Sequence, residues 1–130
     1  MQDDGEYPNL VSKKVLLVDD DDFVRDSTTY FLKSYDLEVM AVANAPDAVK
    51  VFSEQSFDLV VLDMLLPNQS GGVAAYFAFR KKSATMPILL CSGEELSLRD
   101  AIFDGDLNVR FLQKPYDPIG FLNELSDMLS

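Results

Sequence analysis

Five short apolar runs recur along the chain, and each pair is separated by enough residues to form a helix. They are rich in β-branched or bulky side chains and are bounded by turn-forming or charged residues, which is typical of strands. The runs are residues 15–18 (VLLV), 37–42 (LEVMAV), 57–62 (FDLVVL), 87–92 (PILLCS) and 109–113 (VRFLQ). The third contains LVVL without polar alternation, which indicates a central strand covered on both faces.

The segments between these runs have the three- and four-residue apolar spacing of helices. Helices are expected between the first and second strands, between the second and third, and over residues 71–82, 94–104 and 118–129. Asn44 is the expected N-cap of the second helix, with Pro46 in its first turn. Strands joined by helical crossovers pair in parallel with right-handed connections. The predicted fold class is α/β, a single doubly wound five-stranded parallel sheet with helices on both faces.

Length and composition favour one domain. The 130 residues are 48% hydrophobic, which suits a single compact unit with its own core. Residues 1–12 are polar and contain Gly and Pro, so we expect a loose N-terminal tail followed by a domain over residues 13–130. The start of the chain lacks the pattern of a secretory signal, and no apolar run reaches membrane-spanning length. These features predict a cytoplasmic protein without a membrane partner.

Charge and residue usage narrow the chemistry. With 11 basic and 22 acidic residues, the net charge of −11 disfavours direct binding to nucleic acid or anionic lipid. A single cysteine excludes an intramolecular disulfide and fits a reducing compartment. The chain has no histidine, so a metal site would have to use oxygen ligands.

Polar side chains follow the predicted strands at the edge where parallel sheets bind ligands. Asp19 and Asp20 end the first strand, Asp63 the third, Ser92 the fourth, and Lys114 follows the fifth. Carboxylates brought so close repel each other unless a cation lies among them, and an open all-oxygen site suits Mg²⁺, with Mn²⁺ as an alternative ion.

Each of these residues also has an ordinary structural interpretation. Asp63 could simply end a strand, Ser92 could be a turn hydroxyl, and Lys114 could be a solvated surface cation. For Asp21 and Asp22 we prefer the structural interpretation, because negative charge is favourable at the start of a helix. It is the joint placement of the others that predicts a site.

The motifs in this order resemble the receiver domain of two-component response regulators, the CheY-like family. They are Asp19-Asp20 followed by Arg25, LDMLLPNQSG around Asp63, PILLCSG with Ser92, and FLQKP with Lys114-Pro115. The resemblance covers roughly residues 14–129. It implies a flavodoxin-like (βα)5 fold with strand order 2-1-3-4-5 and a cis peptide bond before Pro115.

The resemblance also implies roles for individual residues. Asp63 would be the phosphoacceptor, with Ser92 and Lys114 contacting the phosphoryl group. The metal ligands would be Asp20, Asp63 and the backbone carbonyl of Leu65, while Asp19 would hold a water of the ion's coordination shell. The expected donor is a sensor histidine kinase or a histidine phosphotransfer protein.

A switch is implied as well. In receivers, the residues at the positions of Ser92 and Phe111 move on phosphorylation and remodel the face of the fourth helix, fifth strand and fifth helix for a downstream partner. Such a chain is a signalling module that catalyses only its own phosphorylation and dephosphorylation. Phe111 could equally be an ordinary core or edge aromatic.

Two other function classes fit part of the pattern. A phosphorylation-independent binding module would keep the fold but not the reaction. A haloacid-dehalogenase-type phosphatase would use Asp19 and Asp21 as its D-x-D motif, with Ser92 and Lys114 in later roles. That assignment leaves Asp63 without a function, so we rank it well below the receiver.

Overall fold

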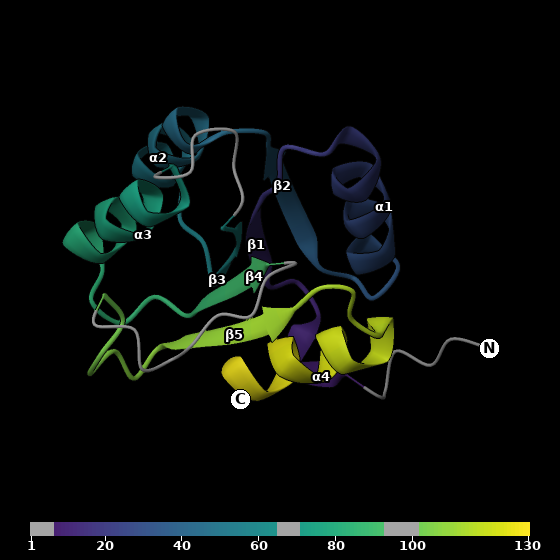
Figure 1. Cartoon of the computed structure of the whole chain (residues 1–130). Coiled ribbons are helices and arrows are strands. Elements are labelled where there is room, and N and C mark those ends of the chain that lie inside the picture. The colour runs from purple at the N-terminus through teal and green to yellow at the C-terminus, as the bar shows by residue number, and fades with distance from the viewer. Residues whose placement is uncertain (1–6, 65–70, 93–101) are drawn as a thin grey trace.

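A computed structural model describes residues 7–64, 71–92 and 102–130. Its single sheet is parallel throughout and has the order β2-β1-β3-β4-β5 (Figure 1). The strands are β1 (Lys14–Val18), β2 (Glu38–Val42), β3 (Leu59–Asp63), β4 (Ile88–Ser92) and β5 (Val109–Gln113). The predicted fold class and strand order are therefore confirmed, and Asp63 is the last residue of β3 itself.

Four α-helices are present among the described residues, together with one short 3-10 helix. They are α1 (Asp22–Lys33), α2 (Ala45–Glu54), α3 (Gly71–Lys82), α4 (Pro118–Met128) and η2 (Pro8–Leu10). The helix predicted over residues 71–82 has those bounds. The helix predicted over 94–104 falls largely outside the described residues, and its last positions, 102–104, lie in a turn. The cis bond between Lys114 and Pro115 is present.

The sheet is covered on both faces, as Figure 1 shows. Helices α2 and α3 pack on one face and α1 and α4 on the other. Alternate residues of a strand enter opposite cores, because successive side chains point to opposite faces. In β3, Val60 and Leu62 join the α2/α3 core, whereas Leu59 and Val61 join the α1/α4 core. This double burial explains why the LVVL run has no polar alternation.

The N-terminal segment differs from the loose tail that was predicted. Over residues 7–12 the chain packs on the domain, with Leu10 fully buried and the Tyr7 ring edge-on to Tyr35. The Tyr7 hydroxyl donates to Asn123 of α4 over 2.9 Å. The polar, Gly- and Pro-containing composition of residues 1–12 does not indicate that Tyr7 and Leu10 have packing partners elsewhere in the chain. Residues 1–6 lie outside the described part of the chain.

An ion pair fastens the end of α3 to the turn before β5. Arg80 Nε donates to Asp106 Oδ2 over 2.6 Å and Nη2 donates to Oδ1 over 3.1 Å. The same guanidinium donates to the carbonyls of Ser83, Met86 and Asn108, so all five of its N–H groups are used. We call this contact the Arg80 clamp; both side chains are nearly buried.

The Arg80 clamp should make the free energy of unfolding depend on pH in the acid range. Burial by itself raises the pKa of Asp106, but hydrogen bonds from Arg80 and Tyr76 outweigh it, and the pKa lies below its ordinary 3.8. Because the pKa of Asp106 is lower in the folded state, its ionised carboxylate stabilises the fold at any pH above the ordinary pKa. This stabilisation is lost as the pH falls through the pKa of the folded state.

Urea unfolding at neutral pH and at about pH 3 would measure this dependence, with Asp106→Asn as the comparison. The difference in unfolding free energy between the wild type and the variant should be larger at neutral pH. A difference that stays constant between the two pH values would contradict the assignment to Asp106.

Candidate functional site

The four aspartates in the connection between β1 and α1 make different contacts. Asp19 is buried. Its Oδ2 accepts a hydrogen bond from the Lys114 ammonium over 3.1 Å, and its Oδ1 accepts one from the amide of Asp21 over 2.9 Å. Asp21 is the N-cap of α1, where its carboxylate accepts the amide of Val24 over 3.0 Å. Asp22 begins the helix, and Asp20 is exposed. The structural roles predicted for Asp21 and Asp22 are confirmed.

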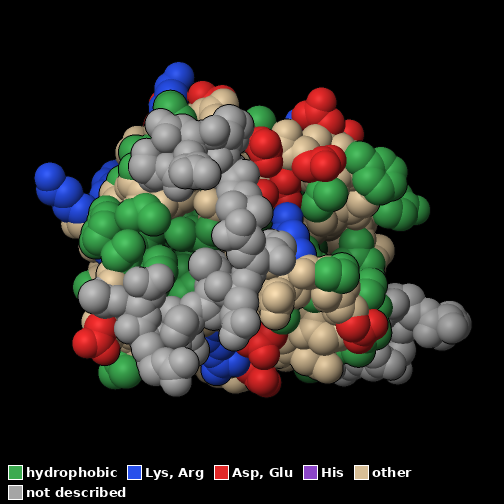
Figure 2. Space-filling view, viewed as in Figure 1, with side chains coloured by type: hydrophobic (Ala, Val, Ile, Leu, Met, Phe, Trp, Pro, Cys, Tyr) green, Lys and Arg blue, Asp and Glu red, His purple; other side chains and the backbone are tan. Residues whose placement is uncertain are grey.

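Three carboxylates converge at the carboxyl edge of the sheet. Asp19, Asp20 and Asp63 each offer one oxygen, and these three oxygens lie within 4.8 Å of one another. Register explains the meeting, because β1 and β3 are paired neighbours, with Val18 opposite Leu62. Figure 2 shows acidic side chains directly beside a basic group near the centre of this face.

The basic partner in this cluster is Lys114, which directly follows β5. Its Nζ lies 3.1 Å from Asp19 Oδ2 and 3.6 Å from Asp63 Oδ2. Burial by itself lowers the pKa of Lys114, but the two carboxylates outweigh it, and the pKa lies above its ordinary value. The lysine therefore stays charged at neutral pH and partly offsets the repulsion among the carboxylates.

Strand β4 contributes Ser92, which is 1% exposed, and backbone contacts that fix the neighbouring residues. The Ser92 carbonyl accepts the amide of Lys114 over 2.6 Å, and the Cys91 carbonyl accepts the amide of Met64 over 2.9 Å. Burial raises the pKa of the Cys91 thiol to about 12, so this thiol is a packing group.

A close approach between backbones positions the start of α3. A Cβ added at Gly72 would lie 3.0 Å from the Cα of Met64 and 3.1 Å from its carbonyl oxygen. Only glycine lets the helix pack this tightly against the residue that follows Asp63. The sequence pattern did not predict this contact, because nothing in it indicates that two backbone segments approach each other here.

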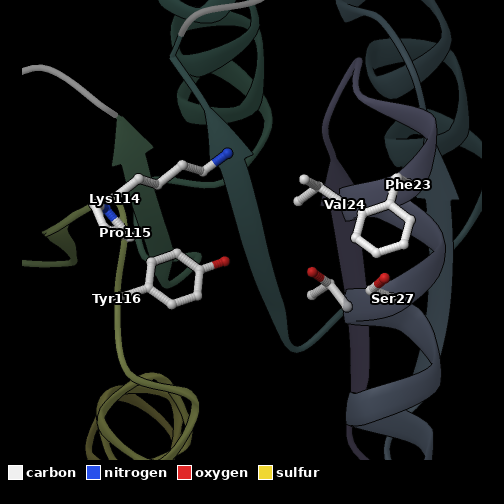
Figure 3. A pocket seen from close by; sticks show the side chains of 7 residues that line it. Phe23, Val24, Ser27, Lys114, Pro115 and Tyr116 are labelled. Carbon is white, nitrogen blue, oxygen red and sulfur yellow. The ribbon is translucent and has the colours of Figure 1, made fainter.

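An apolar groove of about 540 Å³ opens beside Lys114 (Figure 3). Phe23 and Val24 of α1 line one wall, and Pro115 and Tyr116 line the other. The Tyr116 hydroxyl points across the groove toward α1, and burial is the main cause that raises the pKa of this phenol. Phe23 is 79% exposed, an unusual state for so large an apolar side chain. Neither Phe23 nor Tyr116 was predicted as a site residue.

Of the two remaining predicted residues, Phe111 is described by the structure and Leu65 is not. Phe111 is partly buried, packs against the α2/α3 core and meets Phe103 edge-on at 5.2 Å between ring centroids. Phe103 in turn packs edge-on against Tyr76 of α3. Leu65 lies outside the described residues, so its carbonyl stays a predicted ligand.

The donor set suits a hard divalent cation. It consists of carboxylate oxygens alone, two of them on buried residues and one on an exposed residue that leaves a side open to solvent. Mg²⁺ is held by few carboxylates and keeps several waters, which such an open arrangement permits. The residues present therefore fit a magnesium ion.

Comparison with known proteins gives one consistent result. The family model described as "Response regulator receiver domain" matches residues 15–126. Chemotaxis protein CheY of Halobacterium salinarum is 28% identical over 123 residues, covering 92% of this chain and 99% of that protein. Transcription factor prr1 of Schizosaccharomyces pombe is 31% identical over 117 residues, which are 89% of this chain but only 21% of that protein.

Solved structures agree with these matches. The structure of Vibrio cholerae chemotaxis protein CheY4 superposes with a TM-score of 0.82 at 26% identity, covering 92% of this chain and 100% of that one. A CheY-like receiver domain from Methanospirillum hungatei gives a TM-score of 0.80, also at 26% identity, over 91% and 94% of the two chains.

Proposed function

Because this chain belongs to the response regulator receiver domain family, we propose that it accepts a phosphoryl group onto Asp63 from a phosphohistidine in a magnesium-dependent reaction. The observation that carries the proposal is the convergence of Asp19, Asp20 and Asp63 within 4.8 Å, with the Lys114 ammonium 3.6 Å from Asp63. A nucleophile, a cation site and a fixed ammonium are the components that phosphoryl transfer to a carboxylate requires.

In the proposed reaction, a carboxylate oxygen of Asp63 attacks the phosphorus of the donor. A new P–O bond forms as the P–N bond to the donor imidazole breaks, and the electron pair of that bond leaves with the imidazole nitrogen. Asp19, Asp20, Asp63 and the carbonyl of Leu65 would hold Mg²⁺. When bound, the ion neutralises charge on the transferring group and orients it for in-line attack.

Lys114 and Ser92 would complete the site. Before transfer, the Lys114 ammonium contacts Asp19 and Asp63; afterwards it would contact a phosphoryl oxygen, which carries more negative charge than the carboxylate it replaces. The Ser92 hydroxyl would donate to a second phosphoryl oxygen. Ser92 is the last residue of β4 and Lys114 directly follows β5, so both groups lie at the carboxyl edge of the sheet.

The donor must be another protein or domain, because this chain contains no histidine. We propose a sensor histidine kinase or a histidine phosphotransfer protein, whose apolar helix would cover the groove beside Lys114. The exposed Phe23 ring and the groove wall formed by Pro115 and Tyr116 support this approach.

The output would be a shift in population between two conformations. Ser92 and Phe111 would move toward the phosphorylated site, and the face that includes β5 and α4 would bind the downstream partner. In this proposal the chain catalyses only the making and breaking of its own aspartyl phosphate.

Intact-protein mass spectrometry after incubation with acetyl phosphate and Mg²⁺ tests the proposal. We expect a single phosphoryl adduct that is absent when EDTA replaces Mg²⁺. No adduct under either condition would favour a phosphorylation-independent binding module. Steady release of inorganic phosphate that is lost in Asp19→Asn would favour the phosphatase alternative.

A further inference from the structure

Arg25 makes two contacts that bracket the exposed aspartate of the site. Its Nη1 donates to the backbone carbonyl of Asp19 over 3.0 Å, and its Nη2 donates to the Asp22 carboxylate over 2.6 Å. Asp20 lies between these two positions in the chain. The Arg25 side chain is 19% exposed, whereas the Asp22 side chain is 87% exposed.

The rest of this connection has other supports. The Asp19 carboxylate accepts the amide of Asp21 over 2.9 Å, a contact that also spans Asp20. The Asp19 amide donates to the Val42 carbonyl over 3.1 Å, which holds the residue to β2. The Asp21 carboxylate caps α1 at Val24. Arg25 adds a side-chain contact from the end of β1 to the first residue of α1, across the turn that contains Asp20.

We propose that Arg25 is a positioning residue for the magnesium site and that its two contacts hold Asp19 and Asp20 in the arrangement that binds the ion. The inference rests on the proposed function, because it requires that Asp19, Asp20 and Asp63 bind Mg²⁺. Groups that orient metal ligands without touching the metal commonly change metal affinity by about 10- to 100-fold.

Guanidinium geometry explains why arginine is needed at this position. Two separate nitrogens reach two acceptors three residues apart, and the planar group holds them in a fixed relation. A lysine has one ammonium on a flexible stem, so it keeps the charge but cannot hold both acceptors in the same way.

Charge and geometry predict opposite results when Arg25 is replaced. If the guanidinium acted only through its positive charge, removing it would strengthen the binding of a cation nearby. If it acts by holding the turn, removing it weakens Mg²⁺ binding although a repulsive charge has gone. The direction of the change therefore distinguishes the two explanations.

Isothermal titration with Mg²⁺ alone, without a phosphodonor, measures this direction. We expect the dissociation constant of Arg25→Gln to rise on the order of tenfold. The dissociation constant of Arg25→Lys should rise similarly, because lysine keeps the positive charge but does not make the paired contacts. Lys33→Gln removes the same charge from the last turn of the same helix and should leave the constant unchanged.

Thermal unfolding in the absence of Mg²⁺ shows that each variant is folded at the temperature of titration. Should Arg25→Gln fail to fold, Arg25→Lys carries the test. A dissociation constant that stays the same or falls in the folded variant overturns the role of Arg25. A wild type that does not bind Mg²⁺ overturns the proposed function itself, which is a distinguishable result.

Discussion

Replacement of Asp63 by asparagine should eliminate the phosphoryl adduct formed from acetyl phosphate and Mg²⁺. The amide is nearly the same size as the carboxylate, but it carries no negative charge and does not act as a nucleophile toward phosphorus. It also removes one of the three converging carboxylates, so the cation site weakens at the same time. Both effects act in the same direction, and the adduct should fall below detection in intact-protein mass spectra.

Asp104→Asn is the matched control, because Asp104 is exposed and precedes β5, at the end of the strand opposite Lys114. This variant makes the same change of charge and should be phosphorylated like the wild type. If Asp63→Asn were still modified at the wild-type rate and the adduct mapped elsewhere, Asp63 would not be the acceptor.

Arg80→Ala should cause the largest loss of folding stability among single changes of charged residues in the described part of the chain. The variant leaves Asp106 nearly buried without its cation and frees three backbone carbonyls that Arg80 now satisfies. Removing one partner of a buried ion pair costs about 3–5 kcal/mol. We expect about 3 kcal/mol, because both side chains keep slight contact with solvent.

Arg110→Ala provides the comparison, since Arg110 pairs with Glu124 at 3.3 Å on the surface and is 45% exposed. Exposed pairs contribute about 0–1 kcal/mol, so this variant should be close to the wild type. Urea unfolding followed by circular dichroism measures both. Equal losses for the two variants would show that the Arg80 clamp contributes no more than a surface pair.

Much of the fold could be predicted because its determinants are local and periodic. The observed bounds of α3 are those predicted, and the Asn44 cap and its partner amide at Asp47 are three residues apart. Strand order came from the family resemblance, since apolar runs do not indicate which neighbours pair. The packing of Tyr7 and Leu10 was missed because their partners lie far along the chain.

The candidate site also has features that the sequence predicted and features that it did not. Parallel strands bring Asp19, Asp63 and Lys114 to one edge, so strand ends alone were enough to place them together. The two contacts of Arg25 depend on the direction in which its side chain points, which apolar periodicity does not indicate. The Arg80 clamp depends on a partner 26 residues away in the chain, which periodicity does not indicate either. Ser92 is buried at the predicted edge, while its movement and that of Phe111 stay predictions.

The buried thiol of Cys91 has a practical consequence for spectroscopy. It is the chain's single cysteine, is 2% exposed and has a pKa raised to about 12 by burial, so maleimide reagents at neutral pH meet almost no thiolate there. A cysteine introduced at the 94% exposed position of Leu107 would carry a fluorophore or spin label at one defined place. Site-specific labelling therefore needs no cysteine-free background.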